Sequence, residues 1–161
     1  MMRHTIVTVG ELRVAHFRAA ADDYLRRIRA HAAIEMVSIP GERIPRRLSD
    51  ADRSRIVQGE SDRLWAAGAD GHVLRVALDE RGRQMSSVEL ARFLAQKGVE
   101  GHSRAVWFVG GPLGLSQSLI RRCEVHLSLS SFTFPHEMVP VILLEQLYRA
   151  GKIQRREPYH Y

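Results

Sequence analysis

Short apolar runs alternate along the chain with segments whose hydrophobic residues recur at helical spacing. The apolar runs predict strands at 5–9, 34–39, 72–78, 105–109 and 125–129. Helices are predicted over 14–28, 50–67, 86–97, 116–123 and a last segment whose body is 141–150, with Pro135 in its first turn. The run at 105–109 is apolar throughout, as expected for a strand covered on both faces. This alternation predicts one α/β domain over 1–161, built on a mainly parallel sheet.

Length and composition set the class of protein. A chain of 161 residues can bury a core without disulfides. The single cysteine, Cys123, excludes an intramolecular disulfide and a cysteine-based zinc site, and no other metal-ligand spacing stands out. No apolar run approaches the roughly 20 residues that cross a bilayer, and the first residues do not read as a signal peptide. We therefore expect a soluble cytoplasmic protein with no membrane partner and no metal.

The formal net charge is +6, with basic residues scattered rather than gathered in a tail. Such an excess favours a polyanionic partner, since basic side chains neutralise phosphates and release counterions. Solvated helix faces and exposed loops would give the same count. Charge alone therefore leaves nucleic-acid binding open.

Three turns that follow predicted strands carry unusual chemistry. They are 78–82 (LDERG), 110–114 (GGPLG) and 129–136 (LSSFTFPH). Because the carboxyl ends of parallel strands meet at one edge of a sheet, we expect these turns to converge on one cleft.

The residues of these turns suit an adenosine better than a triphosphate. Glycines at 110, 111 and 114 would let backbone approach a ligand, while Ser130 and Thr133 offer hydroxyls beside the rings of Phe132 and Phe134. No lysine-serine or lysine-threonine pair follows the glycines, so the turn is not a P-loop. Taken alone, a glycine-rich turn more often forms a tight strand-to-helix connection, and that alternative stays open.

Five stretches in chain order resemble the RlmH family of SPOUT-class methyltransferases. They are LDERG at 78–82, GGPLGL at 110–115, SLS and TFPH within 128–136, LEQLYRA at 144–150 and PYH at 158–160, with YLRR at 24–27 also similar. The resemblance implies a Rossmann-like SPOUT fold with a C-terminal trefoil knot. It also implies a homodimer whose active site is completed by the partner, and transfer of a methyl group from S-adenosylmethionine. The substrate would be N3 of a pseudouridine in 23S ribosomal RNA, on the assembled ribosome.

The resemblance also assigns roles to residues of this sequence. His136 and Arg149 would be catalytic, and Tyr159 and His160 would contact the RNA. The cofactor would be held by Leu78, Gly110, Gly111, Gly114, Leu129, Ser130, Ser131, Phe132, Thr133 and Phe134. For His136 a helix cap is the plainer reading, and for the last residues a frayed chain end.

Two positions depart from the family pattern. Pro140 stands where the family usually has arginine, and Tyr161 stands where a basic residue is common. A proline inside a helix costs about 3 kcal/mol but is tolerable in the first turn, so we expect the last helix to begin around Glu137 or later.

The missing arginine leaves one alternative open, a non-catalytic RNA-binding protein on the same fold. A hydrolase is not supported, because the chain has no G-x-S-x-G turn. For the homodimer, we expect an interface on the apolar face of the last helix, including Val141, Leu144 and Leu147.

Overall fold

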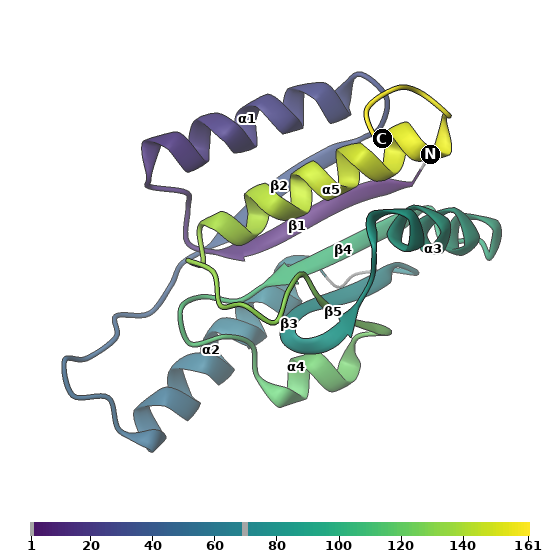
Figure 1. Ribbon diagram of the computed structural model, residues 1–161. Helices are drawn as coiled ribbons and strands as arrows, with labels where there is room; N and C mark the ends of the chain where they lie inside the picture. Colours follow the sequence, from purple (N-terminus) through teal and green to yellow (C-terminus); the bar gives the residue numbers. More distant parts are fainter. Residues whose placement is uncertain (1, 69–70) are drawn as a thin grey trace.

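Strands and helices alternate along the chain in the computed structural model, which describes residues 2–68 and 71–161 (Figure 1). The strands are β1 (Arg3–Val9), β2 (Ile34–Ile39), β3 (Leu74–Gln84), β4 (Arg104–Val109) and β5 (Val125–Ser128). The helices are α1 (Ala15–Arg29), α2 (Asp50–Gly68), α3 (Ser87–Val99), α4 (Gln117–Arg122) and α5 (Met138–Gln154). Each predicted strand and helix is confirmed, although β3 and α5 run further than predicted.

The strands form one parallel sheet in the order β2-β1-β4-β3-β5. In the middle of the sheet, Ile6 of β1 lies between Met36 of β2 and Trp107 of β4. The predicted α/β fold with a parallel sheet is confirmed. Because all strands point the same way, their carboxyl ends share one edge of the sheet.

Both faces of the sheet are buried, since successive side chains point to opposite faces. Ile6 and Trp107 lie in the core formed with α1, α3 and α5, whereas Val7 and Phe108 lie in the core formed with α2 and α4. Figure 1 shows α1, α5 and α3 side by side over one face and α2 and α4 on the other. This double cover is why the central strands are apolar throughout.

Helix starts follow local sequence signals. The Ser86 hydroxyl accepts a hydrogen bond from the backbone of Glu89, whose carboxylate accepts one from the Ser86 backbone, and this capping box starts α3 where the predicted helix begins. The α5 helix begins at Met138, after Glu137, and Pro140 is its third residue. A proline there has no interior hydrogen bond to lose, so the late start predicted from Pro140 is confirmed. Pro135 precedes the helix instead of lying in its first turn.

The apolar face of α5 belongs to the subunit's own core. Leu144 and Leu147 are buried against α1, α3 and the sheet, and only Val141 is half-exposed. The prediction that these leucines supply a dimer interface is therefore wrong. They read as interface residues in the sequence because periodicity marks an apolar face without saying what covers it.

Cys123 is buried at the end of α4, and burial raises the pKa of its thiol to about 12. Within the described ranges no helix is long and apolar enough to cross a membrane. Nor do three or more His, Cys, Asp or Glu side chains group there as metal ligands.

Candidate active site

A cleft of about 610 Å³ lies at the carboxyl-terminal edge of the sheet, beyond β3, β4 and β5. Its walls come from 78–81, from 109–115 and from 129–136 except Ser131, with additions from Arg53, Leu127 and Val139. The prediction that the three segments meet in one cleft is confirmed. Ser131 is exposed and lies outside the lining.

The first segment is part of β3, so the prediction of a loop at 78–82 is wrong. Leu78 and Arg83 both pair with Leu127 of β5, and the residues between them leave the regular ladder. A Cβ on Gly82 would lie 2.7 Å from the backbone carbonyl carbon of His126, so only glycine lets β3 pass this close to β5. The irregular stretch carries Asp79 and Arg81 into the cleft wall.

The glycine-rich turn after β4 is shaped by contacts within the protein. A Cβ on Gly110 would lie 2.7 Å from the carbonyl carbon of Gly114, which itself has a φ of 83°. A Cβ on Gly111 would lie 3.1 Å from Oε2 of the buried Glu60. The fold of the turn itself requires glycine at 110 and favours it at 114, so the alternative of a tight connection accounts for these two glycines. Their side of the turn still lines the cleft.

The third segment holds itself in shape through serine hydroxyls. Ser128 Oγ donates to the backbone oxygen of Ser130 (2.9 Å), and Ser130 Oγ accepts from the backbone nitrogen of Phe132 (3.0 Å). Thr133 Oγ1 lies 3.5 Å from a carboxylate oxygen of Glu80, which links the third segment to the first. Phe134 is half-buried, whereas the Phe132 side chain is 78% exposed. Phe132 therefore offers an uncovered ring at the rim.

His136 lies exposed on the rim of the cleft, just before α5. Its neighbour Glu137 accepts hydrogen bonds from the backbone nitrogens of Arg13 and of Val14 (3.1 Å for Val14). Although partial desolvation acts against it, those hydrogen bonds lower the pKa of Glu137. These two hydrogen bonds hold the start of α5 against the segment that leads into α1. The backbone that carries the His136 side chain is therefore held in place.

The last residues fold back on α5, so the alternative of a frayed end is wrong for Tyr159. Its hydroxyl donates to Glu145 (3.1 Å) and its ring meets the ring of Tyr148 edge-on, with centroids 4.8 Å apart. The Arg149 guanidinium lies 4.6 Å from the centroid of the Tyr159 ring and donates to Glu145. Burial, together with hydrogen bonds to Tyr24 and Glu145, raises the pKa of Tyr159. His160 is exposed, with Nδ1 3.5 Å from Arg149.

Cleft and C-terminal residues lie at opposite ends of α5. From Met138 to Arg149 the helix rises by about 16 Å, at roughly 1.5 Å per residue. His136, before the helix, and Arg149 therefore do not meet within one subunit. Of the predicted site residues, the structure brings together those of the cleft with His136, and separately Arg149 with Tyr159 and His160.

The model of the family described as "Predicted SPOUT methyltransferase" matches residues 2–160. The chain belongs to the SPOUT methyltransferase family. Proteins named "Ribosomal RNA large subunit methyltransferase H" are similar over nearly the whole chain. The one from Symbiobacterium thermophilum is 43% identical and the one from Heliobacterium modesticaldum 39%, each over 99% of both chains. The resemblance to the RlmH family is thus confirmed.

Two solved structures of probable methylases share the fold at low sequence identity. A probable methyltransferase from Bordetella pertussis Tohama I superposes with a TM-score of 0.56 at 15% identity, covering 92% of this chain and 96% of that one. A probable methylase family protein from Haemophilus influenzae Rd KW20 gives a TM-score of 0.53 at 13% identity, covering 99% and 70%. At these identities the likeness speaks for the fold alone.

Sequence patterns missed several cleft residues of this SPOUT domain. Arg53 reaches the cleft from the first turns of α2, and Val139 from the start of α5. Arg53 reads in the sequence as one more solvated charge on a polar helix, so no local signal marks it. Its position beside the cleft follows from where α2 begins, which only the fold decides.

Proposed function

We propose that this protein uses S-adenosylmethionine to methylate large-subunit ribosomal RNA. The observation that carries the proposal is the cleft of about 610 Å³ at the carboxyl ends of β3, β4 and β5 in a SPOUT methyltransferase domain. Full-length relatives at about 40% identity, named as methyltransferases of large-subunit ribosomal RNA, support the substrate. The net charge of +6 fits a polyanionic partner.

The cleft fits the cofactor in size and in chemistry. Its volume falls within the range of roughly 300–1,000 Å³ typical of small-molecule sites. Leu78, Leu129 and Phe134 supply apolar walls for an adenine, while the glycine turn and Thr133 supply backbone and hydroxyl groups for ribose and amino-acid atoms. S-adenosylmethionine, when bound, carries a methyl group already activated on a sulfonium. The work left to the protein is to exclude water and to align the acceptor atom.

We further propose N3 of a pseudouridine as the acceptor and His136 as the group that receives the N3 proton. N3 of a uracil-type ring carries a hydrogen that must leave when the new bond to carbon forms. His136 stands exposed at the cleft rim on a backbone fixed by Glu137, where an incoming base can reach it. Arg149 would stabilise the negative charge left on the ring, since hydrogen bonding to Glu145 raises its pKa and keeps it cationic.

A homodimer is part of the proposal because His136 and Arg149 are too far apart to act together in one subunit. A two-fold axis would bring the C-terminal end of one α5 toward the cleft of the other subunit. The trefoil knot remains a proposal as well. It rests on membership of the SPOUT methyltransferase family.

Of the two residues expected to contact the RNA, Tyr159 and His160, His160 is the better candidate. The Tyr159 ring is already covered by Tyr148 and Arg149, so its role would be to position the arginine. His160 is exposed and beside the same guanidinium. The ribosome as partner and the cytoplasm as location belong to this proposal, since assembled ribosomal subunits are found there.

The alternative is a non-catalytic RNA-binding protein on the same fold. Pro140 in place of a family arginine was the only feature that favoured it, and Pro140 is buried in the first turn of α5. Full-length relatives at about 40% identity are named as methyltransferases, which weighs against this alternative.

The test measures methyl transfer from labelled S-adenosylmethionine to ribosomes, with mass mapping of the modified nucleotide. Ribosomes from a strain that lacks the gene should accept label at one pseudouridine, and ribosomes from the parent strain should not. His136→Ala should lower kcat by about 10²–10⁴-fold while cofactor affinity stays unchanged. Cofactor binding with no transfer to any ribosomal particle would favour the non-catalytic alternative.

Composite sites can be tested by co-expressing His136→Ala and Arg149→Ala chains. Each variant alone should be nearly inactive. If one site uses His136 of one chain and Arg149 of its partner, random pairing gives half heterodimers with one intact site each, or about a quarter of wild-type activity. Recovery no greater than the two variants measured alone would contradict the composite site.

A further inference from the structure

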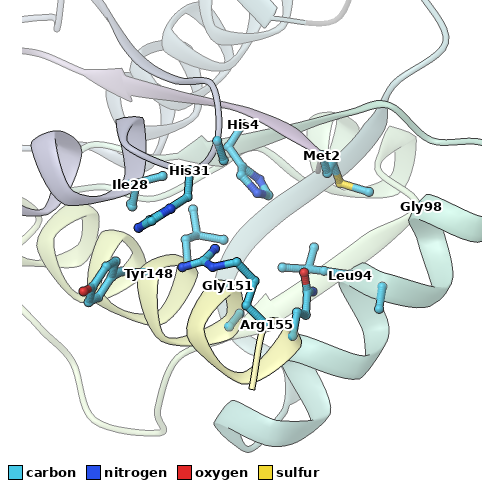
Figure 2. A pocket seen from close by; sticks show the side chains of 14 residues that line it. Met2, His4, Ile28, His31, Leu94, Gly98, Tyr148, Gly151 and Arg155 are labelled. Atoms are coloured by element: carbon cyan, nitrogen blue, oxygen red, sulfur yellow. The ribbon is translucent and has the colours of Figure 1, made fainter. Parts of the chain in front are cut away.

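A second cavity lies at the opposite end of α5, between α1, α3 and α5 at the amino-terminal edge of β1 (Figure 2). Its volume is about 170 Å³, and most of its wall is apolar, with Ile28, Leu94, Ala150 and Leu147 among the lining residues. An apolar cavity of roughly 150 Å³ accommodates a benzene molecule. The space therefore suits a six-membered ring or a branched chain of similar size.

His4 supplies a buried donor to this cavity. Its side chain extends from β1 into the lining and only 6% of the residue is exposed. Nδ1 accepts a hydrogen bond from Trp107 Nε1 (3.2 Å), which fixes the proton of the neutral ring on Nε2. Burial lowers the pKa of His4 to about 4, so at neutral pH the ring is uncharged. Among the described residues Nε2 has no hydrogen-bond partner, so its proton is available to an acceptor in the cavity.

Arg155 brings a cation to the same cavity from the end of α5. Figure 2 shows His4, His31 and Arg155 directed toward the space between the helices. The guanidinium is paired with Glu157 through Nε (2.8 Å), which holds it in place and offsets part of its charge. A Cβ on Gly151 would lie 3.2 Å from Nη1 of Arg155, so this glycine makes room for the guanidinium across the helix.

We propose that this cavity binds a small carboxylate with an apolar body, such as an aromatic or branched aliphatic acid. The carboxylate would accept from Nε2 of His4 and from the donors at the rim, and the ring or chain would fill the apolar part between Leu94 and Leu147. A phosphate fits less well, because a hydrated dianion would meet mostly apolar walls and one cation already paired with Glu157. A neutral molecule of the same shape would gain nothing from the part of the Arg155 charge that Glu157 does not offset.

This site is separate from the proposed methyl-transfer cleft, and none of its lining residues lines that cleft. Its occupancy can therefore be tested without measuring methylation. Full-length protein is titrated with benzoate, followed by calorimetry and by ¹H–¹⁵N correlation of the backbone and of the histidine rings. Benzyl alcohol and inorganic phosphate serve as matched probes for shape and charge.

Benzoate should bind saturably with a dissociation constant near about 1 mM, equivalent to roughly −4 kcal/mol. Shifts should centre on His4, His31 and Leu94, and both other probes should bind at least about fivefold more weakly. Arg155→Gln should weaken benzoate by about tenfold. The neighbouring Arg156→Gln is the control, since Arg156 is exposed and outside the lining.

Ala95→Phe gives a second variant that keeps the Arg155–Glu157 pair and fills the mouth of the cavity. It should abolish benzoate binding while S-adenosylmethionine binding is unchanged. Three outcomes would overturn the proposal: no saturable binding of benzoate, phosphate binding as tight as benzoate, or equal loss of affinity in the Arg155 and Arg156 variants. The last would reduce the effect to general charge.

Discussion

Replacing Gly110 by alanine inserts a methyl group into the turn that forms one wall of the cleft. The new Cβ would lie 2.7 Å from the carbonyl carbon of Gly114 and 2.9 Å from its oxygen. Ordinary contacts between carbon atoms begin near 3.5 Å, so the backbone at residue 110 and the backbone at Gly114 must separate by close to 1 Å. Because the obstacle is backbone, no side chain can move aside to relieve the overlap.

Overpacking of this kind costs about 1–3 kcal/mol of unfolding free energy. For a chain of this size each kcal/mol lowers the melting temperature by about 2–4 °C, so a decrease of several degrees is expected. The displaced turn should also lower affinity for S-adenosylmethionine by at least about tenfold, because the cleft loses the shape of one wall.

Gly98→Ala is the matched control for the same chemical change. Gly98 lies in α3, and its Cβ would meet no atom within 4 Å. Alanine inside a helix is favoured over glycine by roughly 0.5–1 kcal/mol, so this variant should be more stable than wild type and should bind the cofactor normally. The assay is urea unfolding followed by circular dichroism, with calorimetry for the cofactor. A Gly110→Ala protein as stable as Gly98→Ala would refute the reasoning.

Other predictions concern single groups. Thr133→Trp should reduce cofactor affinity about tenfold and Ser131→Trp should leave it unchanged, since both positions are exposed and only Thr133 lines the cleft; calorimetry decides. A thiol reagent at pH 8 should not modify Cys123 in the folded protein and should modify it in urea, because burial raises the pKa of the thiol to about 12. The folded pKa of His4, about 4, lies below its ordinary 6.5, so its contribution to stability is complete above pH 6.5. That contribution should fall by about 1.4 kcal/mol per pH unit toward pH 4, and His4→Gln should flatten this part of the urea-unfolding profile. Hydrogen bonds from Arg155 and from Lys152 lower the pKa of Glu157 to about 2. The folded tail should therefore be retained from neutral pH down to about 4 and loosen as the pH falls further toward 2. Contacts between Tyr159 and Tyr148 in NMR spectra report it; a tail already released at pH 5 would contradict the assignment.

Local patterns in this sequence predict much of the fold. Strands covered on both faces are apolar at successive positions, which is why the apolar run at 105–109 predicts the strand β4. Ser86 and Glu89 mark the start of α3 because a capping box uses only residues of its own turn. The convergence of three segments on one cleft also follows from sequence, since strands separated by helices run parallel and end at one edge.

Only the tertiary structure decides which parts of the chain pack against each locally predicted element. Leu144 and Leu147 form an apolar face in any reading, but only the fold shows that α1, α3 and the sheet cover it. The glycines of 110–114 suggest a ligand, whereas the contact that forbids a side chain at Gly110 comes from Gly114 in the same turn. The length of β3 likewise depends on β5, which pairs with it again at Arg83.

The separation of the cleft residues from Arg149 is another feature that only the tertiary structure decides. His136 and Arg149 are 13 positions apart in the chain, which says nothing about their distance in space. The straight α5 helix between them holds them at opposite ends, because each residue adds about 1.5 Å of rise. The cavity at His4 was invisible in the sequence for a related reason. Its walls come from the first strand and from three helices spread over the whole chain, and only packing brings them together.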